Sequence, residues 1–274
     1  MSQTYTAVDE SSDPPGAVDW QEQMAGWPVV RAYKARTHEL IGNRAPVLDV
    51  GCGPGADLGS LGPTRAIGVD PSLAMCLRAK QSGAPLCRAA VERLPFRDAS
   101  LAACRTDRVL QHVVDPEAAL AEMVRVTGPG GLIVAAEPDQ ESLVIRVPGV
   151  SVALCDQVKA LRRDVGYRNG RLASSLPHLL AGRGLRQIGV EAFPLVITHP
   201  AMAFGLPNWP RLWNERGVSS FSPSDLAEWD AGIREAATNG LVYSLTFMVV
   251  WGTIPGARRC RVPTSSRGTQ PIRS

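Results

Sequence analysis

Three glycines follow a short apolar run in 47-VLDVGCGPGADLG-59, at Gly51, Gly53 and Gly55. Glycine costs backbone entropy in an ordered chain, so such a cluster marks a place where another group approaches the main chain closely. A glycine turn between a strand and a helix leaves N–H groups unpaired at the positive end of the helix dipole. The stretch therefore predicts a site for a phosphate or a carboxylate, on either a dinucleotide or an amino-acid-bearing cofactor.

Nearby acids help to choose between these two ligands. Gly51, Gly53 and Ala56 fit the loose G-x-G-x-x-G/A pattern of nicotinamide and flavin binders, so a nicotinamide-dependent oxidoreductase stays open. Asp49 precedes the first glycine by two residues, where it would repel a pyrophosphate but suits a cationic ligand. Asp70 ends the next apolar run, in position to accept hydrogen bonds from ribose hydroxyls.

The elements that must position these residues alternate along the chain. The patterns predict strands at 46–50, 65–69, 85–89, 101–106, 131–136, 185–197 and 241–252, and helices at 17–41 (with a break at Pro28), 55–61, 72–82, 116–126, 150–165, 171–182 and 223–239. Strands that alternate with helices of this length imply βαβ crossovers and a parallel sheet. Asp115 and Ser222 each precede a proline and predict helix N-caps, whereas Gly128, Gly130 and Gly131 are expected to end one helix and start the next strand.

The run from Val47 to Pro138 resembles the class I S-adenosylmethionine-dependent methyltransferases, in the branch similar to the quinone-biosynthesis C-methyltransferases. The matching pieces are VLDVGCGPG, GVDPSLAM, VERLPF and RVLQHVVDPEAALAEMVRVTGPGGLIVAAEPD, in order over a third of the chain. The flanks resemble actinobacterial small-molecule methyltransferases more loosely. The resemblance implies an α/β Rossmann-like sheet of seven mostly parallel strands with an antiparallel last strand. Helices on both faces and an N-terminal helical lid complete the expected fold.

The resemblance also implies S-adenosyl-L-methionine as the cofactor and S-adenosyl-L-homocysteine as its product. The loop amides would bind the carboxylate, Asp70 the ribose, and Met75 would lie against the adenine. The residues expected at the cofactor are Asp49, Gly51, Gly53, Gly55, Asp70, Pro71, Met75, Val91, Glu92, Asp107, Arg108 and His112. Relatives carry Asp-Ala where Ala90 and Val91 stand, so one side-chain contact to the adenine is lost here.

Three residues are candidates for the chemical step. His112 follows the fourth strand, where it would serve as a general base, contact the cofactor or cap the next helix. Glu137 ends the fifth strand, and Tyr33 lies on the predicted lid. The motif N-P-P-[FY], which holds acceptor nitrogens in relatives, is replaced by 105-RTDR-108, which favours a carbon or oxygen acceptor. No carboxylate cluster has the spacing of the magnesium site in catechol-type enzymes, so no metal is expected.

Tryptophans suggest where the acceptor binds. All six lie outside residues 47–140, and they either fill gaps between added helices or line an apolar pocket. The second interpretation predicts an apolar aromatic or polyketide-like small molecule of secondary metabolism, with an indole carbon as one option. Its expected contacts are Trp20, Trp27, Asp139, Trp209 and Trp213, with the last two on a partly exposed rim.

Composition limits the alternatives. The formal charge of +3 comes from five arginines after residue 254, which leave 24 basic against 26 acidic residues, so nucleic acid is not expected. No apolar run is long enough for a membrane span, and the polar start and scattered single cysteines favour the cytoplasm. A non-catalytic cofactor-binding module stays open, as does a homodimer formed through the N-terminal helix.

These patterns predict that residues 1–16 are disordered and that residues 17–44 form the helical lid. The methyltransferase domain is expected at 45–254, with cap insertions at about 139–183 and 198–239. Residues 255–274 are expected to form a disordered basic tail.

Overall fold

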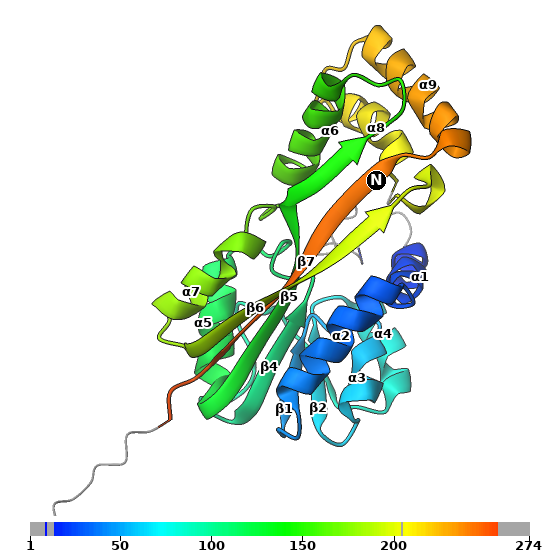
Figure 1. Ribbon diagram of the computed structural model, residues 1–274. Helices are drawn as coiled ribbons and strands as arrows, with labels where there is room; N and C mark the ends of the chain where they lie inside the picture. The colour runs from blue at the N-terminus through cyan, green and yellow to red at the C-terminus, as the bar shows by residue number, and fades with distance from the viewer. Residues whose placement is uncertain (1–8, 10–13, 204, 257–274) are drawn as a thin grey trace, which may run out of the picture.

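The computed structural model describes residues 9, 14–203 and 205–256, and a seven-stranded sheet runs through this part of the chain (Figure 1). The strand order is β3-β2-β1-β4-β5-β7-β6. The first five strands are parallel, and β7 runs antiparallel to both β5 and β6. This arrangement confirms the expected fold class. The strands are β1 (Val47–Val50), β2 (Ala66–Asp70), β3 (Leu86–Arg88), β4 (Leu101–Asp107), β5 (Thr127–Arg146), β6 (Arg186–Ile197) and β7 (Val242–Thr253).

Helices cover both faces of the sheet. One buried apolar cluster includes residues of α2 and α3, and the other includes residues of α5 and α7. The proline-led N-caps at Asp115 and Ser222 are present, and the second is a full capping box with Asp225. The helices are α1 (Pro14–Ala25), α2 (Pro28–Ile41), α3 (Ala56–Leu61), α4 (Leu73–Ala79), α5 (Pro116–Val126), α6 (Val152–Asp164), α7 (Leu176–Gly182), α8 (Trp209–Glu215) and α9 (Pro223–Asn239), with short 3-10 turns at Lys80–Ser82, Ala173–Ser175, Pro200–Met202 and Leu206–Asn208.

Strand β5 is far longer than the sequence predicts. It pairs with β7 from Leu132 to Arg146, with a register irregularity after Asp139, and β5, β7 and β6 continue together beyond the rest of the sheet. Figure 1 shows that the far ends of β5, β7 and β6 carry α6, α8 and α9; we call this region the distal lobe. The expectation that glycines 128, 130 and 131 separate helix from strand is wrong, because α5 ends at Val126 and the glycines lie within β5.

The N-terminal region also differs from expectation. Disorder over residues 1–16 is wrong for Asp9, which accepts hydrogen bonds from Ser72 Oγ, Leu73 N and Ala74 N at the start of α4. It is also wrong for residues 14–16, which belong to α1. The rest of that segment and residues 257–274 of the predicted tail lie outside the described residues. Among the described helices, none has the length and apolar character needed to span a membrane.

Candidate functional site

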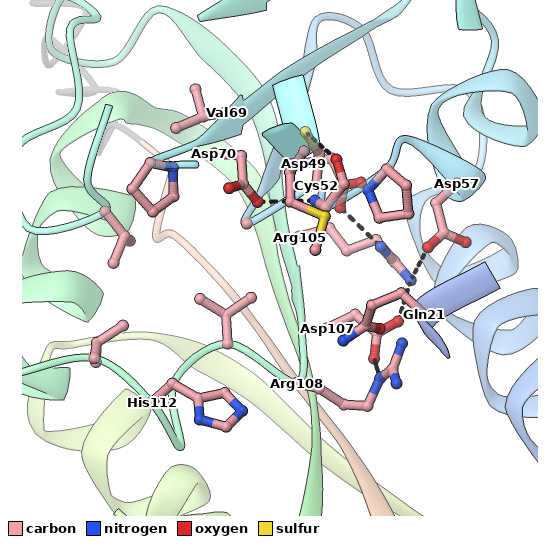
Figure 2. A pocket seen from close by; sticks show the side chains of 18 of the residues that line it. Gln21, Asp49, Cys52, Asp57, Val69, Asp70, Arg105, Asp107, Arg108 and His112 are labelled. Carbon is pink, nitrogen blue, oxygen red and sulfur yellow. Dashed lines mark hydrogen bonds and ion pairs between the residues drawn. The ribbon is translucent and has the colours of Figure 1, made fainter. Parts of the chain in front are cut away.

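A cavity of about 260 Å³ lies at the carboxyl ends of β1, β2 and β4 (Figure 2). Ligands of open α/β sheets bind at this edge. The view places Asp70 and Cys52 above and Arg108 and His112 below. Most of the expected cofactor residues line the cavity: Asp49, Gly51, Gly53, Asp70, Pro71, Met75, Val91, Glu92, Asp107, Arg108 and His112. Gly55 is absent from that lining, and it instead starts α3 as its N-cap.

The glycine loop has the backbone that only glycine adopts easily. Gly51, Gly53 and Gly55 have φ values of 65°, 52° and 83°. A Cβ at Gly51 would lie 2.3 Å from Cγ2 of Val109, whereas a Cβ at Gly53 would meet nothing within 4 Å. Gly51 is therefore required by packing against the loop after β4, and Gly53 keeps the main chain open toward the cavity.

We expect Gly51→Ala to lower the free energy of unfolding by about 2–4 kcal/mol. The new methyl would combine the cost of a left-handed backbone with an overlap against a β-branched side chain. Gly59→Ala is the matched control, because Gly59 is an exposed residue of α3 with nothing within 4 Å of a new Cβ. Urea unfolding of both variants measures the difference. Equal stability of the two variants would contradict the packing account.

Asp70 is held at the end of β2 by backbone donors. Its carboxylate accepts hydrogen bonds of 2.9 Å from Gly53 N and from Ser72 N. Burial raises the pKa of Asp70 to about 6, although these backbone donors favour the ionised form. Asp70 therefore joins the glycine loop to the start of α4 and remains ionised at pH 7.

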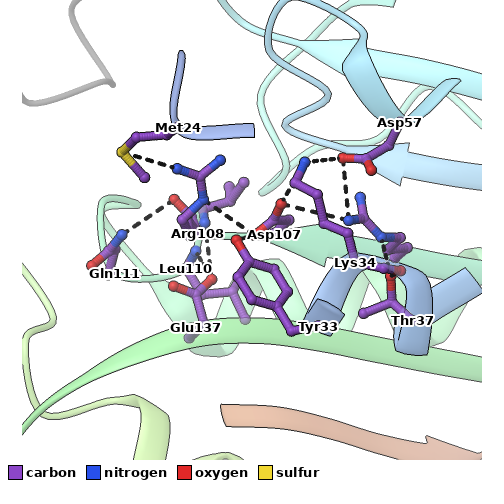
Figure 3. Close-up of polar contacts among 12 residues, drawn as sticks. Met24, Tyr33, Lys34, Thr37, Asp57, Asp107, Arg108, Leu110, Gln111 and Glu137 are labelled. Atoms are coloured by element: carbon purple, nitrogen blue, oxygen red, sulfur yellow. Dashed lines mark hydrogen bonds and ion pairs between the residues drawn. The ribbon is translucent and has the colours of Figure 1, made fainter. Parts of the chain in front are cut away.

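Residues of α2, α3, β1 and β4 form a buried ion network that short sequence patterns do not predict, and Figure 3 shows Lys34, Asp57 and Asp107 within it. Arg105 Nη1 lies 2.7 Å from Asp49, and its Nη2 lies 3.2 Å from Asp57 and 3.5 Å from Asp107. Lys34 of α2 pairs with Asp57 and, at 3.0 Å, with Asp107. These five residues all line the cavity, so its floor carries charges of both signs.

The network sets the charge states of its acids. Burial alone would raise the pKa of Asp57, but the positive charges of Arg105 and Lys34 hold it well below the usual range. The pKa of Asp107 falls to about 2 because Lys34, Arg108 and Arg105 outweigh its burial. Both carboxylates therefore stay ionised in a region that water does not reach freely.

Tyr33 and Glu137 lie next to this network rather than in the lining of the cavity. The hydroxyl of Tyr33 donates to Asp107 at 2.9 Å, and burial raises its pKa well above the usual value. Glu137 accepts from Val109 N at 2.9 Å and Leu110 N at 2.7 Å, while its Oε2 is buried without a partner among the described residues. Burial raises the pKa of Glu137 to about 8.

His112 lies in the wall of the cavity, and its ring packs against Tyr167 with centroids 5.4 Å apart. Burial lowers the pKa of His112 to about 3, and the positive charges of Arg108 and Arg162 act in the same direction. The imidazole is therefore neutral at pH 7, which makes it a proton acceptor of low basicity. The helix cap that follows comes from Asp115, so the capping role considered for His112 is wrong.

The residues expected to contact the acceptor are spread over the molecule. Trp27, Asp139, Trp209 and Trp213 do not line the cavity described above, and Trp20 belongs to α1 with a side chain outside the described part of the chain. The partly exposed rim is wrong for Trp209 and Trp213. Both belong to α8 and are buried in the distal lobe, with ring centroids 5.8 Å apart.

Comparisons with known proteins agree with this geometry. A family model described as a methyltransferase domain matches residues 48–135. An uncharacterized methyltransferase of Mycolicibacterium gilvum is 38% identical over 196 residues, which cover 66% of this chain and 73% of that protein. An uncharacterized 37.1 kDa protein in a transposon of Streptomyces fradiae is 38% identical over 185 residues, covering 62% of this chain and 52% of that protein.

The fold is similar to the crystal structure of the YcgJ protein from Bacillus subtilis, with a TM-score of 0.56 and 16% identity over 82% of this chain and 99% of that chain. This likeness concerns the fold alone. The chain spans about half the length of the first curated relatives, 52% and 43%. The domain match, the Mycolicibacterium relative and the sheet topology lead to one conclusion. The chain belongs to the class I S-adenosylmethionine-dependent methyltransferase family.

Proposed function

We propose that this chain transfers a methyl group from S-adenosylmethionine to a carbon or oxygen atom of an apolar aromatic or polyketide-like small molecule in secondary metabolism. An indole carbon is one acceptor of this class. The observation that carries the proposal is the cavity that joins the glycine loop, Asp70 and a floor with charges of both signs. The more specific kinship to quinone-biosynthesis enzymes stays a prediction.

The lining residues fit the cofactor. Its methionine end carries an ammonium and a carboxylate, and the floor offers the carboxylates of Asp49 and Asp107 beside the cations of Lys34 and Arg108. The open main chain at Gly53 leaves room for a close approach. Asp70 would hold the ribose, and Pro71, Met75 and Val91 would surround the base.

Of the lid predicted at 17–44, helix α2 is packed in the core with Tyr33 and Ile41 buried, so the lid that we propose is α1 alone. Gln21 and Ala25 line the cavity, so α1 reaches its mouth. The helix is attached to α4 through Glu22, which accepts hydrogen bonds of 2.6 Å and 3.1 Å from Arg78. An attachment by exposed ion pairs is weak, so this helix would open for cofactor exchange and close to exclude water.

When bound, the cofactor supplies an electrophilic methyl group on a sulfonium. The protein contributes alignment, which alone provides effective molarities of roughly 10⁵–10⁸ M, and the exclusion of water. An acceptor that received this methyl group from the sulfonium would also have to lose a proton. His112 is neutral and would take that proton, and protonated Glu137 below the loop after β4 would keep that loop in place.

Two measurements test the proposal. Calorimetric titration should show binding of S-adenosylhomocysteine and no binding of nicotinamide cofactors. Incubation with radiolabelled S-adenosylmethionine and a panel of phenols, indoles and aromatic polyketides should transfer label to at least one compound. Stabilisation by a nicotinamide cofactor alone would favour the oxidoreductase, and tight binding with no transfer to any acceptor would favour the non-catalytic module.

We expect His112→Ala to reduce turnover by about 10²–10⁴ while the affinity for S-adenosylhomocysteine changes much less. This range is typical of a lost proton acceptor. His178→Ala is the matched control, because His178 is exposed on α7 and away from the cavity lining. Steady-state kinetics and calorimetry measure the two quantities. A loss of affinity with unchanged turnover at saturation would instead identify His112 as a cofactor contact.

A further inference from the structure

Arg162 is a buried cation in the distal lobe without an acidic partner among the described residues. Only 9% of its surface is exposed, and it forms no ion pair with a carboxylate among the described residues. Its Nη2 donates to the hydroxyl of Tyr167 at 2.7 Å, whereas its Nε is buried with no acceptor. A buried guanidinium without a counter-charge is costly, so the binding of an anion beside it would be favourable.

Two aromatic rings pack against this guanidinium. Its central carbon lies 4.1 Å from the ring centroid of Trp209 and 4.9 Å from that of Tyr167. Trp209 in turn contacts Tyr243, whose hydroxyl also interacts with Arg162; burial raises the pKa of Tyr243 to about 12, so this phenol is a neutral partner and not a counter-charge at neutral pH. A planar carboxylate that approaches the Nε edge would satisfy the guanidinium and lie among aromatic surfaces.

The position of Arg162 connects it to the cofactor cavity. The ring of Tyr167, on which Arg162 lies, packs against His112 in the cavity wall. The loop that holds Tyr167 is attached to the loop after β4, because the side-chain amide of Asn169 donates to Leu110 O and Val113 O at 2.9 Å each. A molecule bound at Arg162 therefore has its far end near the edge of the sheet where the methyl donor would lie.

Strand β5 supplies a second unsatisfied polar side chain. Gln140 is fully buried, and neither its Oε1 nor its Nε2 has a partner among the described residues. It lies where the β5–β7 pairing becomes irregular, at the passage from the sheet to the distal lobe. Buried polar groups are normally hydrogen-bonded, so two such side chains in neighbouring elements point to a missing ligand.

We infer that Arg162 anchors the acceptor, and that the acceptor is an aromatic molecule that carries a carboxylate. This inference rests on the proposed function. Trp209 and Tyr167 would flank the carboxylate end of such a molecule. The negative charge of the acceptor would also offset one of the cations that surround His112. The distal lobe is then the part of the chain that selects the acceptor by charge as well as by shape.

The test compares naphthalene-2-carboxylate with naphthalene-2-carboxamide, two probes of the same shape and different charge. Both are titrated by calorimetry into the full chain saturated with S-adenosylhomocysteine. The carboxylate is expected to bind about ten-fold more tightly than the amide. In Arg162→Met this preference should fall below about two-fold, with the affinity for S-adenosylhomocysteine unchanged. Arg162→Lys keeps the charge without the planar edge and should retain part of the preference.

Arg163→Met is the matched control, because Arg163 is the next residue of α6 and pairs with Asp164. It should keep the full preference for the carboxylate. Equal binding of the two probes by the unmodified chain, or no binding of the carboxylate, would overturn the inference even if Arg162→Met did not fold. Failure of the proposed function would appear separately, as a lack of S-adenosylhomocysteine binding in the unmodified chain.

Discussion

Replacing Arg105 with methionine is expected to lower the free energy of unfolding by about 3–5 kcal/mol. The guanidinium is fully buried and pairs with Asp49, Asp57 and Asp107. After its removal Asp57 and Asp107 would keep Lys34, and Asp107 would also keep Arg108, whereas Asp49 would have no ion-pair partner among the described residues. Breaking a buried ion pair by deleting one partner leaves uncompensated charge, and this cost is large. Denaturant unfolding at pH 7 measures it, and the affinity for S-adenosylhomocysteine should fall because the floor of the cavity is lost.

A second substitution separates the charge effect from the loss of packing. Asp49 has Arg105 as its close ion-pair partner, so the double variant Arg105→Met with Asp49→Leu should recover part of the lost stability. Arg211→Met is the surface control, since Arg211 forms an exposed pair with Asp230 and should change stability very little. Additive losses in the double variant would contradict the ion-network account.

The second large effect that we expect is on the free energy of unfolding, where Glu137 makes a contribution that depends on pH. The folded protein holds its proton up to about pH 8, whereas the ordinary value is 4.5. Between these values the folded state binds one more proton than the unfolded state. This residue therefore lowers the free energy of unfolding by about 1.4 kcal/mol for each unit that the pH rises. The destabilisation is absent below pH 4.5 and complete above pH 8.

Glu137→Gln isolates this contribution. The amide oxygen can still accept the hydrogen bonds from Val109 N and Leu110 N, but it carries no charge at any pH. The stability of the variant relative to the unmodified chain should therefore rise steadily from pH 5 to pH 8, as followed by urea unfolding in a series of buffers. Glu235→Gln on the surface of α9 provides the control. A difference between Glu137→Gln and the unmodified chain that does not change with pH would show that Glu137 is ionised in the fold.

Local signals in the sequence predicted the sheet edge well. Glycines with positive φ, the strand-end Asp70 and the cap at Asp115 each act within a few residues, so their roles follow from short patterns. The ion network was missed because its members are far apart in sequence: Lys34, Asp57 and Arg105 meet only in the folded chain. A charged residue within the apolar run 101–106 was the available signal, because such a charge must find a buried partner.

The distal lobe was the least predictable part. The length of β5 depends on its pairing with β7, about a hundred residues later, and this pairing keeps the chain extended from Leu132 to Arg146, past Pro138, where the sequence pattern indicates no strand. Trp209 and Trp213 belong to a short helix because tertiary packing buries both indoles, although their proline-rich surroundings favour a loop. Arg162 lies in an amphipathic pattern in which a surface position is the ordinary expectation.

Because β5, β6 and β7 all extend beyond the rest of the sheet, the distance between the cavity and the distal lobe can change only by whole residues of these strands. Each residue of an antiparallel strand advances about 3.4 Å, and successive side chains alternate between the two faces. Inserting two residues into each of these strands, after Asp139 in β5, after Pro194 in β6 and before Thr246 in β7, would move the distal lobe outward by about 7 Å and leave each side chain on its original face of the sheet. Inserting one would turn its inner surface to solvent. Relatives with longer or shorter acceptors are thus expected to differ here by even numbers of residues.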